Sequence, residues 1–323
     1  MSPGQGRALA SASPGGGSAI KVVYIAGHNR SGSTLLDRML GQIEGFTSVG
    51  ELRQLWWRGL EENQACGCGV PFHDCRFWAE VIRTAFGTME GGRLHDVIHL
   101  ARQVASVRTV PQLAWPWLRT AQYSSHFREF GNTLRQLYQA IHTANDGAII
   151  VDSSKSPSYG LLLAQLPFLE VHVVHLVRDS RAVAYSQQRP KLKPEIHWEE
   201  QRMKVTRPTS TAVIWSVTNA MLHLLDDHPH YMRVRYEDFV ANPQETLRRI
   251  AGDCGRADVS LPFLRERSVL LGEAHTVSGN PIRFQQGWTA LAPDLEWRDK
   301  LATSDRRIIS AVTAPLLAKY GYF

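Results

Sequence analysis

Short apolar runs alternate along this chain with longer segments in which apolar residues recur every three or four positions. The short runs are rich in Val and Ile and are predicted to be buried strands; they occupy residues 20–26, 148–151, 171–177 and 231–235. The spaced segments are predicted to be helices and cover residues 33–42, 51–62, 77–86, 93–107, 123–144, 211–226, 243–253 and 304–319. Strands that alternate with helices predict an α/β fold, in which helices flank a central, mostly parallel sheet.

Three segments do not follow this alternation. Residues 1–19 are mostly Ser, Gly, Pro and Ala, so they contain too little apolar surface to fold and are predicted to form a disordered tail. The remaining residues, 20–323, are predicted to form a single domain. Within it, residues 86–130 show no strand pattern and are predicted to form a helical cap. Residues 189–210 are rich in Pro, Lys and Arg and are predicted to form a mobile lid, with a solvated surface excursion as the alternative.

The composition narrows the class of protein. The 323 residues are 43% hydrophobic and 20% charged, which is ordinary for a globular protein. The net charge of +6 is compatible with an anionic ligand, and there is no Lys/Arg run of the kind that binds nucleic acid. Because the sequence lacks both a signal-peptide pattern and an apolar stretch of about 18 residues, we expect a cytoplasmic protein without a membrane span. Nothing in the sequence determines the oligomeric state.

Three of the four cysteines lie close together in the sequence. Cys66, Cys68 and Cys75, with His73 beside them, would provide the four ligands of a zinc site. The C-x-C-x6-C spacing, however, differs from the paired C-x2-C pattern of zinc ribbons. A cytoplasmic location also argues against disulfide bonds. We therefore favour a small buried turn without a metal, and the zinc site stays open as the alternative.

The clearest signal for function is the sequence GHNRSGSTLL, which follows the first predicted strand. A glycine-bounded loop that leads into a helix directs backbone N–H groups and the positive end of the helix dipole at one anion. Gly27, Gly32 and Thr34 keep the spacing of a nucleotide-binding P-loop, but Ser33 replaces its lysine. Arg30 supplies a positive charge from inside the loop instead. This P-loop-like arrangement predicts anion binding by arginine rather than by a metal ion.

A second anion site is predicted from the sequence HLVRDSRAVAYS. Arg178 ends a predicted strand, and Ser186 follows eight residues later, about two turns into a helix. An arginine and a hydroxyl placed in this way can hold a second phosphate group. The alternative for Arg178 is an ion pair with Asp179. A kinase would instead need a lysine in the first loop and an acidic strand end to hold Mg²⁺.

Together, the RSGST loop and the VRDSRAVAYS segment resemble those of sulfotransferases that use 3′-phosphoadenosine 5′-phosphosulfate (PAPS). The likeness is closest to the bacterial branch related to tyrosylprotein sulfotransferases, and it extends from about residue 21 to the end of the chain. It implies that PAPS is bound and released as 3′,5′-ADP without a metal. It also implies that Arg178 and Ser186 bind the 3′-phosphate. The 5′-phosphosulfate would be bound by Arg30, Ser31, Gly32, Ser33 and Thr34.

Three further segments resemble parts of the same family. GELRQLW, which follows the first predicted helix, implies that Glu51 is the catalytic base, and VDSSKSP implies that Lys155 contacts the transferring group. The tyrosylprotein enzymes have an acid after that lysine, and Ser156 in this chain weakens any prediction of the same acceptor. SGNPIRFQQG resembles a late loop that closes over the nucleotide, which implies that Arg283 is a further phosphate ligand.

The resulting prediction is transfer of a sulfuryl group to a hydroxyl of a small-molecule, carbohydrate or lipid acceptor. Glu51 would remove the acceptor proton, while Arg30 and Lys155 would stabilise the charge on the leaving phosphate. His28 is the second candidate for the base, and an exposed carboxylate or lysine remains the alternative for Glu51 and Lys155. The competing functions are a P-loop kinase and a non-catalytic nucleotide-binding protein.

Overall fold

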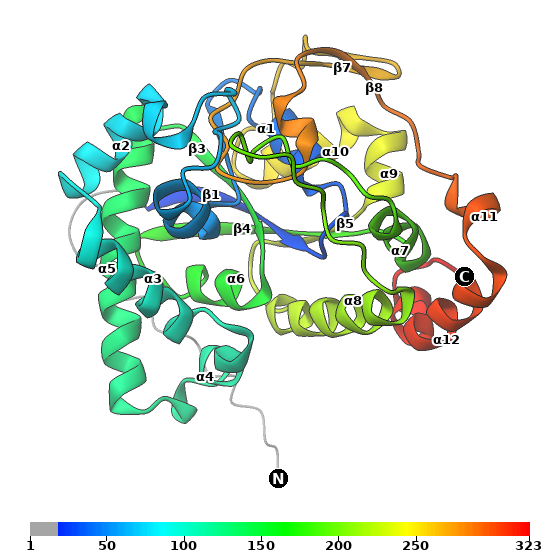
Figure 1. Cartoon of the computed structure of the whole chain (residues 1–323), viewed down its shortest axis with the longest axis horizontal. Coiled ribbons are helices and arrows are strands. Elements are labelled where there is room, and N and C mark those ends of the chain that lie inside the picture. The colour runs from blue at the N-terminus through cyan, green and yellow to red at the C-terminus, as the bar shows by residue number, and fades with distance from the viewer. Residues whose placement is uncertain (1–18) are drawn as a thin grey trace.

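A five-stranded parallel sheet forms the centre of the computed structural model (Figure 1). The structure describes residues 19–323, so the predicted tail at residues 1–19 lies, except for its last residue, outside the described part. The strand order is β2-β3-β1-β4-β5, and every neighbouring pair is parallel. The strands are β1 (Ile20–Gly27), β2 (Phe46–Gly50), β3 (Ile149–Lys155), β4 (Leu169–Val177) and β5 (Tyr231–Arg235). Their carboxyl ends therefore meet along one edge of the sheet.

Helices cover both faces of this sheet, as the α/β prediction requires (Figure 1). No helix in residues 19–323 combines the length and apolar character needed to cross a membrane. The helices are α1 (Ser33–Leu40), α2 (Arg76–Phe86), α3 (Gly91–Val104), α4 (Val110–Ala114), α5 (Ala121–Ala144), α6 (Pro157–Leu163), α7 (Ser180–Gln188), α8 (Pro208–Leu222), α9 (Tyr236–Ala241), α10 (Pro243–Asp253), α11 (Trp297–Lys300) and α12 (Thr303–Lys319).

Alternate residues of the central strand β1 enter two separate cores, because side chains along a strand point to opposite faces. Val22 and Tyr24 pack into the larger core, to which α2, α3, α5 and α6 contribute. Val23 and Ile25 pack into a second core with α1, α9 and α10. Since all four side chains are fully buried, the period-two pattern is hidden in the sequence, and only the continuous apolar run marks the strand.

Sequence analysis missed the short elements. The edge strand β2 has the sequence FTSVG, whose five residues include Thr and Ser, so it lacks the apolar run of the other strands. A three-stranded antiparallel sheet was also missed because its strands have only two to four residues; they are β6 (Leu264–Arg265), β7 (Ser268–Leu271) and β8 (Gly287–Ala290). The helix predicted at 51–62 is a 3₁₀ turn, Leu52–Gln54, followed by a π-helix, Leu55–Glu61.

The contact between α1 and β2 is tight and contains a buried acid. A Cβ atom added to Gly41, which ends α1, would lie 2.4 Å from the Cβ of Ser48. The hydroxyl of Ser48 donates a hydrogen bond of 2.5 Å to Asp37, whose carboxyl is fully buried. Burial raises the pKa of Asp37 from 3.8 to about 7. The helix that follows the first loop is therefore held against the sheet at close range.

We expect Gly41→Ala to destabilise the protein by about 1–3 kcal/mol, because its methyl group forces α1 away from β2. The matched control is Gly252→Ala in α10, where an added Cβ meets no atom within 4 Å. Since alanine favours the helix, this control should be neutral or stabilising by up to about 1 kcal/mol. Urea unfolding measures both changes, and equal effects of the two substitutions would contradict the close approach.

The raised pKa of Asp37 predicts a pH dependence of stability. The folded protein keeps this carboxyl protonated up to about pH 7, whereas the unfolded chain releases the proton near pH 3.8. Stability therefore falls as the pH rises through this window, and Asp37→Asn removes the effect. Between pH 5 and pH 8, the free energy of unfolding of wild type should fall by about 2–3 kcal/mol relative to that of the variant. A difference between the two proteins that stays constant with pH would contradict the burial of an ionisable group here.

Candidate active site

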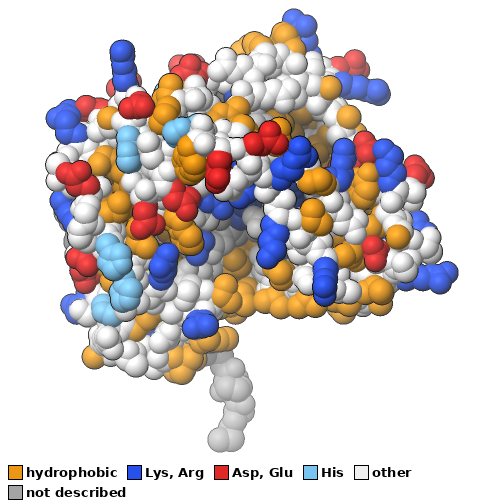
Figure 2. Space-filling model, in the orientation of Figure 1, with side chains coloured by type: hydrophobic (Ala, Val, Ile, Leu, Met, Phe, Trp, Pro, Cys, Tyr) orange, Lys and Arg blue, Asp and Glu red, His pale blue; other side chains and the backbone are white. Residues whose placement is uncertain are grey.

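A cavity of about 580 Å³ lies at the carboxyl ends of the first four strands. Lys and Arg side chains gather around the hollow near the middle of the face shown in Figure 2. In the lining, eight cationic side chains face three acidic ones. The cations are Arg30, Arg58, Lys155, Arg178, Arg189, Lys191, Lys193 and Lys204, and the acids are Glu51, Glu195 and Asp294. This excess of positive charge favours an anionic ligand with several negative groups.

The loop between β1 and α1 forms the floor of this cavity. Gly32 has φ 94°, and a Cβ added there would lie 2.4 Å from a ring carbon of Tyr236, so this position requires glycine. Ser33 and Thr34 begin α1 and line the cavity, where the first backbone N–H groups of a helix have no partner within the helix. Ser31 is buried beneath the loop. The structure therefore has the loop and helix start from which the sequence predicted an anion site, and the binding itself stays a prediction.

Glu51 and Lys155 form a buried ion pair in the same cavity. The Nζ of Lys155 donates to Oε1 of Glu51 across 104 residues of sequence, and only 10% and 12% of the two side chains is exposed. Glu51 directly follows β2 and Lys155 ends β3, and these two strands are neighbours in the sheet. Sequence analysis placed Glu51 after the first helix, and the missed strand β2 explains how its carboxylate reaches the sheet edge.

The side chain of Arg30 is hydrogen-bonded to Ser186, although the two residues lie 156 positions apart in the sequence. The Nε of Arg30 donates to Oγ of Ser186 at 3.1 Å, and one terminal nitrogen donates to the Ser186 carbonyl at 3.3 Å. Arg178 donates to the carbonyl of Arg30 at 3.0 Å and to Asp294 at 3.0 Å. The first loop, the end of β4 and α7 therefore join at one point of the cavity.

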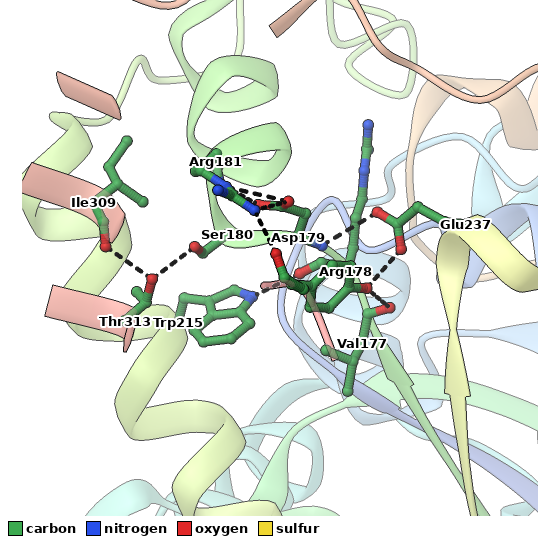
Figure 3. Close-up of polar contacts among 10 residues, drawn as sticks. Val177, Arg178, Asp179, Ser180, Arg181, Trp215, Glu237, Ile309 and Thr313 are labelled. Carbon is green, nitrogen blue, oxygen red and sulfur yellow. Dashed lines mark hydrogen bonds and ion pairs between the residues drawn. The ribbon is translucent and has the colours of Figure 1, made fainter. Parts of the chain in front are cut away.

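The alternative of an ion pair between Arg178 and Asp179 is wrong. Asp179 instead caps α7 and binds Arg181 at 2.7 Å. Figure 3 shows the Arg181 guanidinium turned to Asp179, whereas the side chain of Arg178 points away from that pair. Trp215 donates to the carbonyl of Arg178 at 3.1 Å and so fixes the backbone at the strand end. Arg178 is therefore directed into the cavity.

The close spacing of cations in the cavity lowers the pKa values of two of them. The pKa of Arg30 is lowered, first by burial and then by the charges of Arg178 and Arg189. The pKa of Lys191 is lowered by burial and then by Arg30 and Arg189. Each group is thus protonated against the repulsion of its neighbours, and a polyanion that enters the cavity relieves this repulsion.

Two residues named in the sequence analysis lie behind the cavity wall. Burial lowers the pKa of His28 to about 4, so its imidazole is neutral at pH 7, and its Nδ1 lies 2.7 Å from the carbonyl of Asn29. Arg283 is buried, and its terminal nitrogens donate to the carbonyls of Thr276 and Ala65, each at 2.7 Å. Arg283 therefore fastens two chain segments together and does not line the cavity.

The structure adds a group of residues that sequence analysis did not assign individually. Residues 189–206, which we call the cationic strap, run along the cavity between α7 and α8. Lys191, Lys193 and Lys204 on this strap line the cavity, and an isolated bridge pairs Leu192 with Arg202. The richness of the region in Lys and Arg was the available signal. Its mobility as a lid stays a prediction.

A second, mainly apolar pocket of about 250 Å³ adjoins the cavity and shares two lining residues with it, Gln54 and Arg58. Its walls include Trp56 and Trp57 on the π-helix, with Phe130 of α5 opposite in the lining. Trp115 and Trp117, in the region predicted to be a helical cap, do not line this pocket and are exposed by 40% and 76%.

Comparison with known proteins identifies the family. A model of the sulfotransferase family matches residues 23–259. Among solved structures, the chain is similar to the sulfotransferase domain from the Synechococcus PCC 7002 olefin synthase, with 20% identity, a TM-score of 0.48 and coverage of 94% of this chain and 98% of that one. The sulfotransferase domain from the curacin biosynthetic pathway has 17% identity, a TM-score of 0.44 and coverage of 92% and 99%.

Sulfotransferase STF9 from Mycobacterium avium has 14% identity and a TM-score of 0.46, with 94% of this chain and 77% of that chain covered. No curated protein sequence gives a significant match. The family model spans well over half of the chain, and the features that it covers include the loop after β1, Glu51, Lys155 and the segment from Arg178 to Ser186. The chain belongs to the sulfotransferase family.

Proposed function

We propose that this protein transfers a sulfuryl group from PAPS to a hydroxyl of a small-molecule, carbohydrate or lipid acceptor. The observation that carries this proposal is the buried Glu51–Lys155 ion pair, which lies in the same cation-rich cavity as Arg30 and Arg178. An acid and a cation at this position supply the two functions that in-line group transfer needs, namely proton removal from the acceptor and charge stabilisation on the leaving group.

The donor would be held at both of its charged ends. The 5′-phosphosulfate lies in the first loop, where Ser33, Thr34 and the N–H groups of α1 face the cavity. The 3′-phosphate lies at Arg178 and Ser186. Because Arg30 touches Ser186, its guanidinium is within reach of both anions. A phosphate carries more charge than the carboxylate of Asp294 and would replace it as the partner of Arg178.

In the chemical step, Glu51 accepts the proton of the acceptor hydroxyl, and the acceptor oxygen forms a bond to sulfur. The bond between sulfur and the bridging phosphate oxygen breaks, and 3′,5′-ADP leaves with the electron pair. Lys155 and Arg30 neutralise the charge that grows on this oxygen. In the free protein, the ion pair with Lys155 holds the Glu51 side chain in the cavity before the acceptor binds. In this proposal, side chains alone stabilise the charge that develops in the transition state, and the reaction needs no metal.

The acceptor would enter from the apolar pocket. That pocket meets the cavity at Gln54 and Arg58, on the same chain segment that begins with Glu51. Trp57, which is 44% exposed, offers an apolar surface for an aromatic ring, a sugar face or a lipid chain, and the lining also contains Arg53, Arg58 and Arg102. An acceptor bound there presents its hydroxyl toward Glu51, while the cationic strap covers the donor as a lid.

The first prediction for this function concerns recognition of the 3′-phosphate. Arg178→Ala should weaken binding of 3′,5′-ADP by about 10–100-fold, because a buried charge-assisted contact is lost. Binding of 5′-AMP, which has no 3′-phosphate, should change little. Isothermal titration calorimetry with both nucleotides measures the difference.

The matched control is Arg202→Ala, which removes an exposed arginine of the strap that pairs with Glu200. It should leave both affinities nearly unchanged. Equal losses for the two nucleotides in Arg178→Ala would show that Arg178 does not bind the 3′-phosphate.

The second prediction concerns the chemical step. Wild type should convert labelled PAPS when it is supplied with a metabolite extract, and the product should gain the mass of one sulfonate. Glu51→Gln should cut turnover by about 10²–10⁴-fold while PAPS binding stays nearly intact. Lys155→Ala should also cut turnover, and the two effects should not add because both residues serve one transition state.

Three results would contradict this scheme. A Glu51→Gln variant that keeps full kcat, with a loss in Glu195→Gln or His28→Gln instead, would move the base to one of those residues. Additive effects of the two substitutions would separate the roles of Glu51 and Lys155. Binding of ATP in preference to PAPS would favour a kinase.

A further inference from the structure

Three thiols and one imidazole converge outside the cavity. The ligand atoms of Cys66, Cys68, Cys75 and His275 all lie within 4.8 Å of one another. The fourth residue is not His73, which the sequence suggested, because the His73 ring lies 2.9 Å from the carbonyl of Leu60. His275 comes instead from a segment 200 residues beyond Cys75.

The spacing of these atoms matches a tetrahedral metal site. Sγ of Cys68 and Sγ of Cys75 lie 3.9 Å apart, and Nδ1 of His275 lies 3.4 Å from Sγ of Cys75 and 3.9 Å from Sγ of Cys66. A zinc ion with bonds of about 2.3 Å to sulfur and about 2.0–2.1 Å to nitrogen places its ligand atoms about 3.5–3.8 Å apart. The four ligand atoms are therefore spaced as they would be around one bound zinc ion.

The four ligands differ in their access to solvent. The side chains of Cys66 and Cys75 are buried, whereas Cys68 and His275 are partly exposed, so the site has a route to solvent.

The imidazole is oriented before any metal binds. Its Nδ1 faces the sulfurs of Cys66 and Cys75, and its Nε2 lies on the opposite side of the ring, 3.8 Å from a carboxylate oxygen of Glu273. The ring stacks on Phe77 at 5.0 Å, and the indole of Trp78 donates to the backbone carbonyl of His275 at 2.9 Å.

We propose that Cys66, Cys68, Cys75 and His275 bind one Zn²⁺ in a closed, structural site. Three thiolates and one imidazole form a complete tetrahedral ligand set that leaves no position for substrate. Soft sulfur ligands select zinc over Mg²⁺ and Ca²⁺, which prefer oxygen. This inference does not depend on the proposed sulfuryl transfer, because none of the four residues lines the cavity.

The site would fix one wall of the cavity. Gly67, between two of the ligands, donates its N–H to the carbonyl of Thr276 at 2.9 Å. Beyond Thr276, Ser278 accepts from Arg58 at 2.8 Å, and the N–H of Asn280 donates to the hydroxyl of Thr34 at 3.1 Å. A metal bound by His275 would therefore anchor the start of the segment 275–280. The other end of this segment contacts Thr34, in the first turn of α1.

Metal analysis of the purified full-length chain tests the proposal. We expect about one Zn²⁺ per chain in wild type and almost none in Cys68→Ser or His275→Ala. These two substitutions are chosen because both side chains are partly exposed, so the core is least disturbed. The matched controls are Cys254→Ser, a buried cysteine elsewhere, and His73→Ala; both should keep the full zinc content.

A second measurement uses wild type alone, so that it does not depend on the folding of any variant. Wild type treated with a chelator should melt at a lower temperature, and added Co²⁺ should restore the melting temperature and give the intense visible absorption of a tetrahedral cobalt–thiolate site. Three results would overturn the proposal: no stoichiometric zinc and no cobalt spectrum in wild type, full zinc content in His275→Ala, or a disulfide between Cys68 and Cys75 in protein purified without reductant. Stoichiometric iron in place of zinc would likewise overturn the choice of metal.

Discussion

Repulsion between positive charges at the carboxyl edge of the sheet is the constraint on which the rest of the site depends. Lys155 and Arg178 are buried there, and Arg30 is half-buried beside them. The carboxylates of Glu51 and Asp294 offset the charges of Lys155 and Arg178, and Arg30 donates to the hydroxyl of Ser186. The parallel sheet places the ends of β2 and β3, with Glu51 and Lys155, side by side, whereas Ser186 lies in α7 and Asp294 precedes α11.

The same constraint explains two unusual backbone conformations. Arg30 has φ 69° and Lys155 has φ 65°, in the left-handed region that residues other than glycine seldom occupy. Such conformations cost about 1–3 kcal/mol each and persist where the surroundings hold them in place. For Lys155 the buried ion pair with Glu51 provides the restraint; for Arg30 it is the contact with Ser186. The backbone thus turns two cations toward one cavity at a cost that these contacts offset.

The sequence predicted the parts of this arrangement that depend on local pattern. Continuous apolar runs marked the central strands, and glycine spacing marked the first loop. The edge strand β2 was missed because two of its five residues are polar, so Glu51 was predicted without the element that positions it. The zinc alternative named His73 and did not consider His275, since spacing identifies neighbours in sequence and not residues that meet across 200 positions.

Arginine illustrates this limit most clearly, because the chain uses it for two purposes that the sequence alone does not separate. Arg30 and Arg178 face the cavity. Arg38 and Arg283, in contrast, donate to backbone carbonyls of the segment that closes over α1: one nitrogen of Arg38 donates to Arg283 at 2.8 Å, and Arg283 donates to Thr276 at 2.7 Å.

Hydrogen bonds from a charged group are worth about 1.5–3 kcal/mol each. In the segment of residues 272–283, these guanidinium groups add to the apolar packing of Val277 and Ile282 against the two cores. Both terminal nitrogens of Arg283 donate to backbone carbonyls, which leaves little capacity for a phosphate, whereas one terminal nitrogen of Arg178 donates to the carboxylate of Asp294 in the cavity lining. The distinction between the two groups therefore lies in the acceptors that surround each guanidinium, and those acceptors are set by the fold.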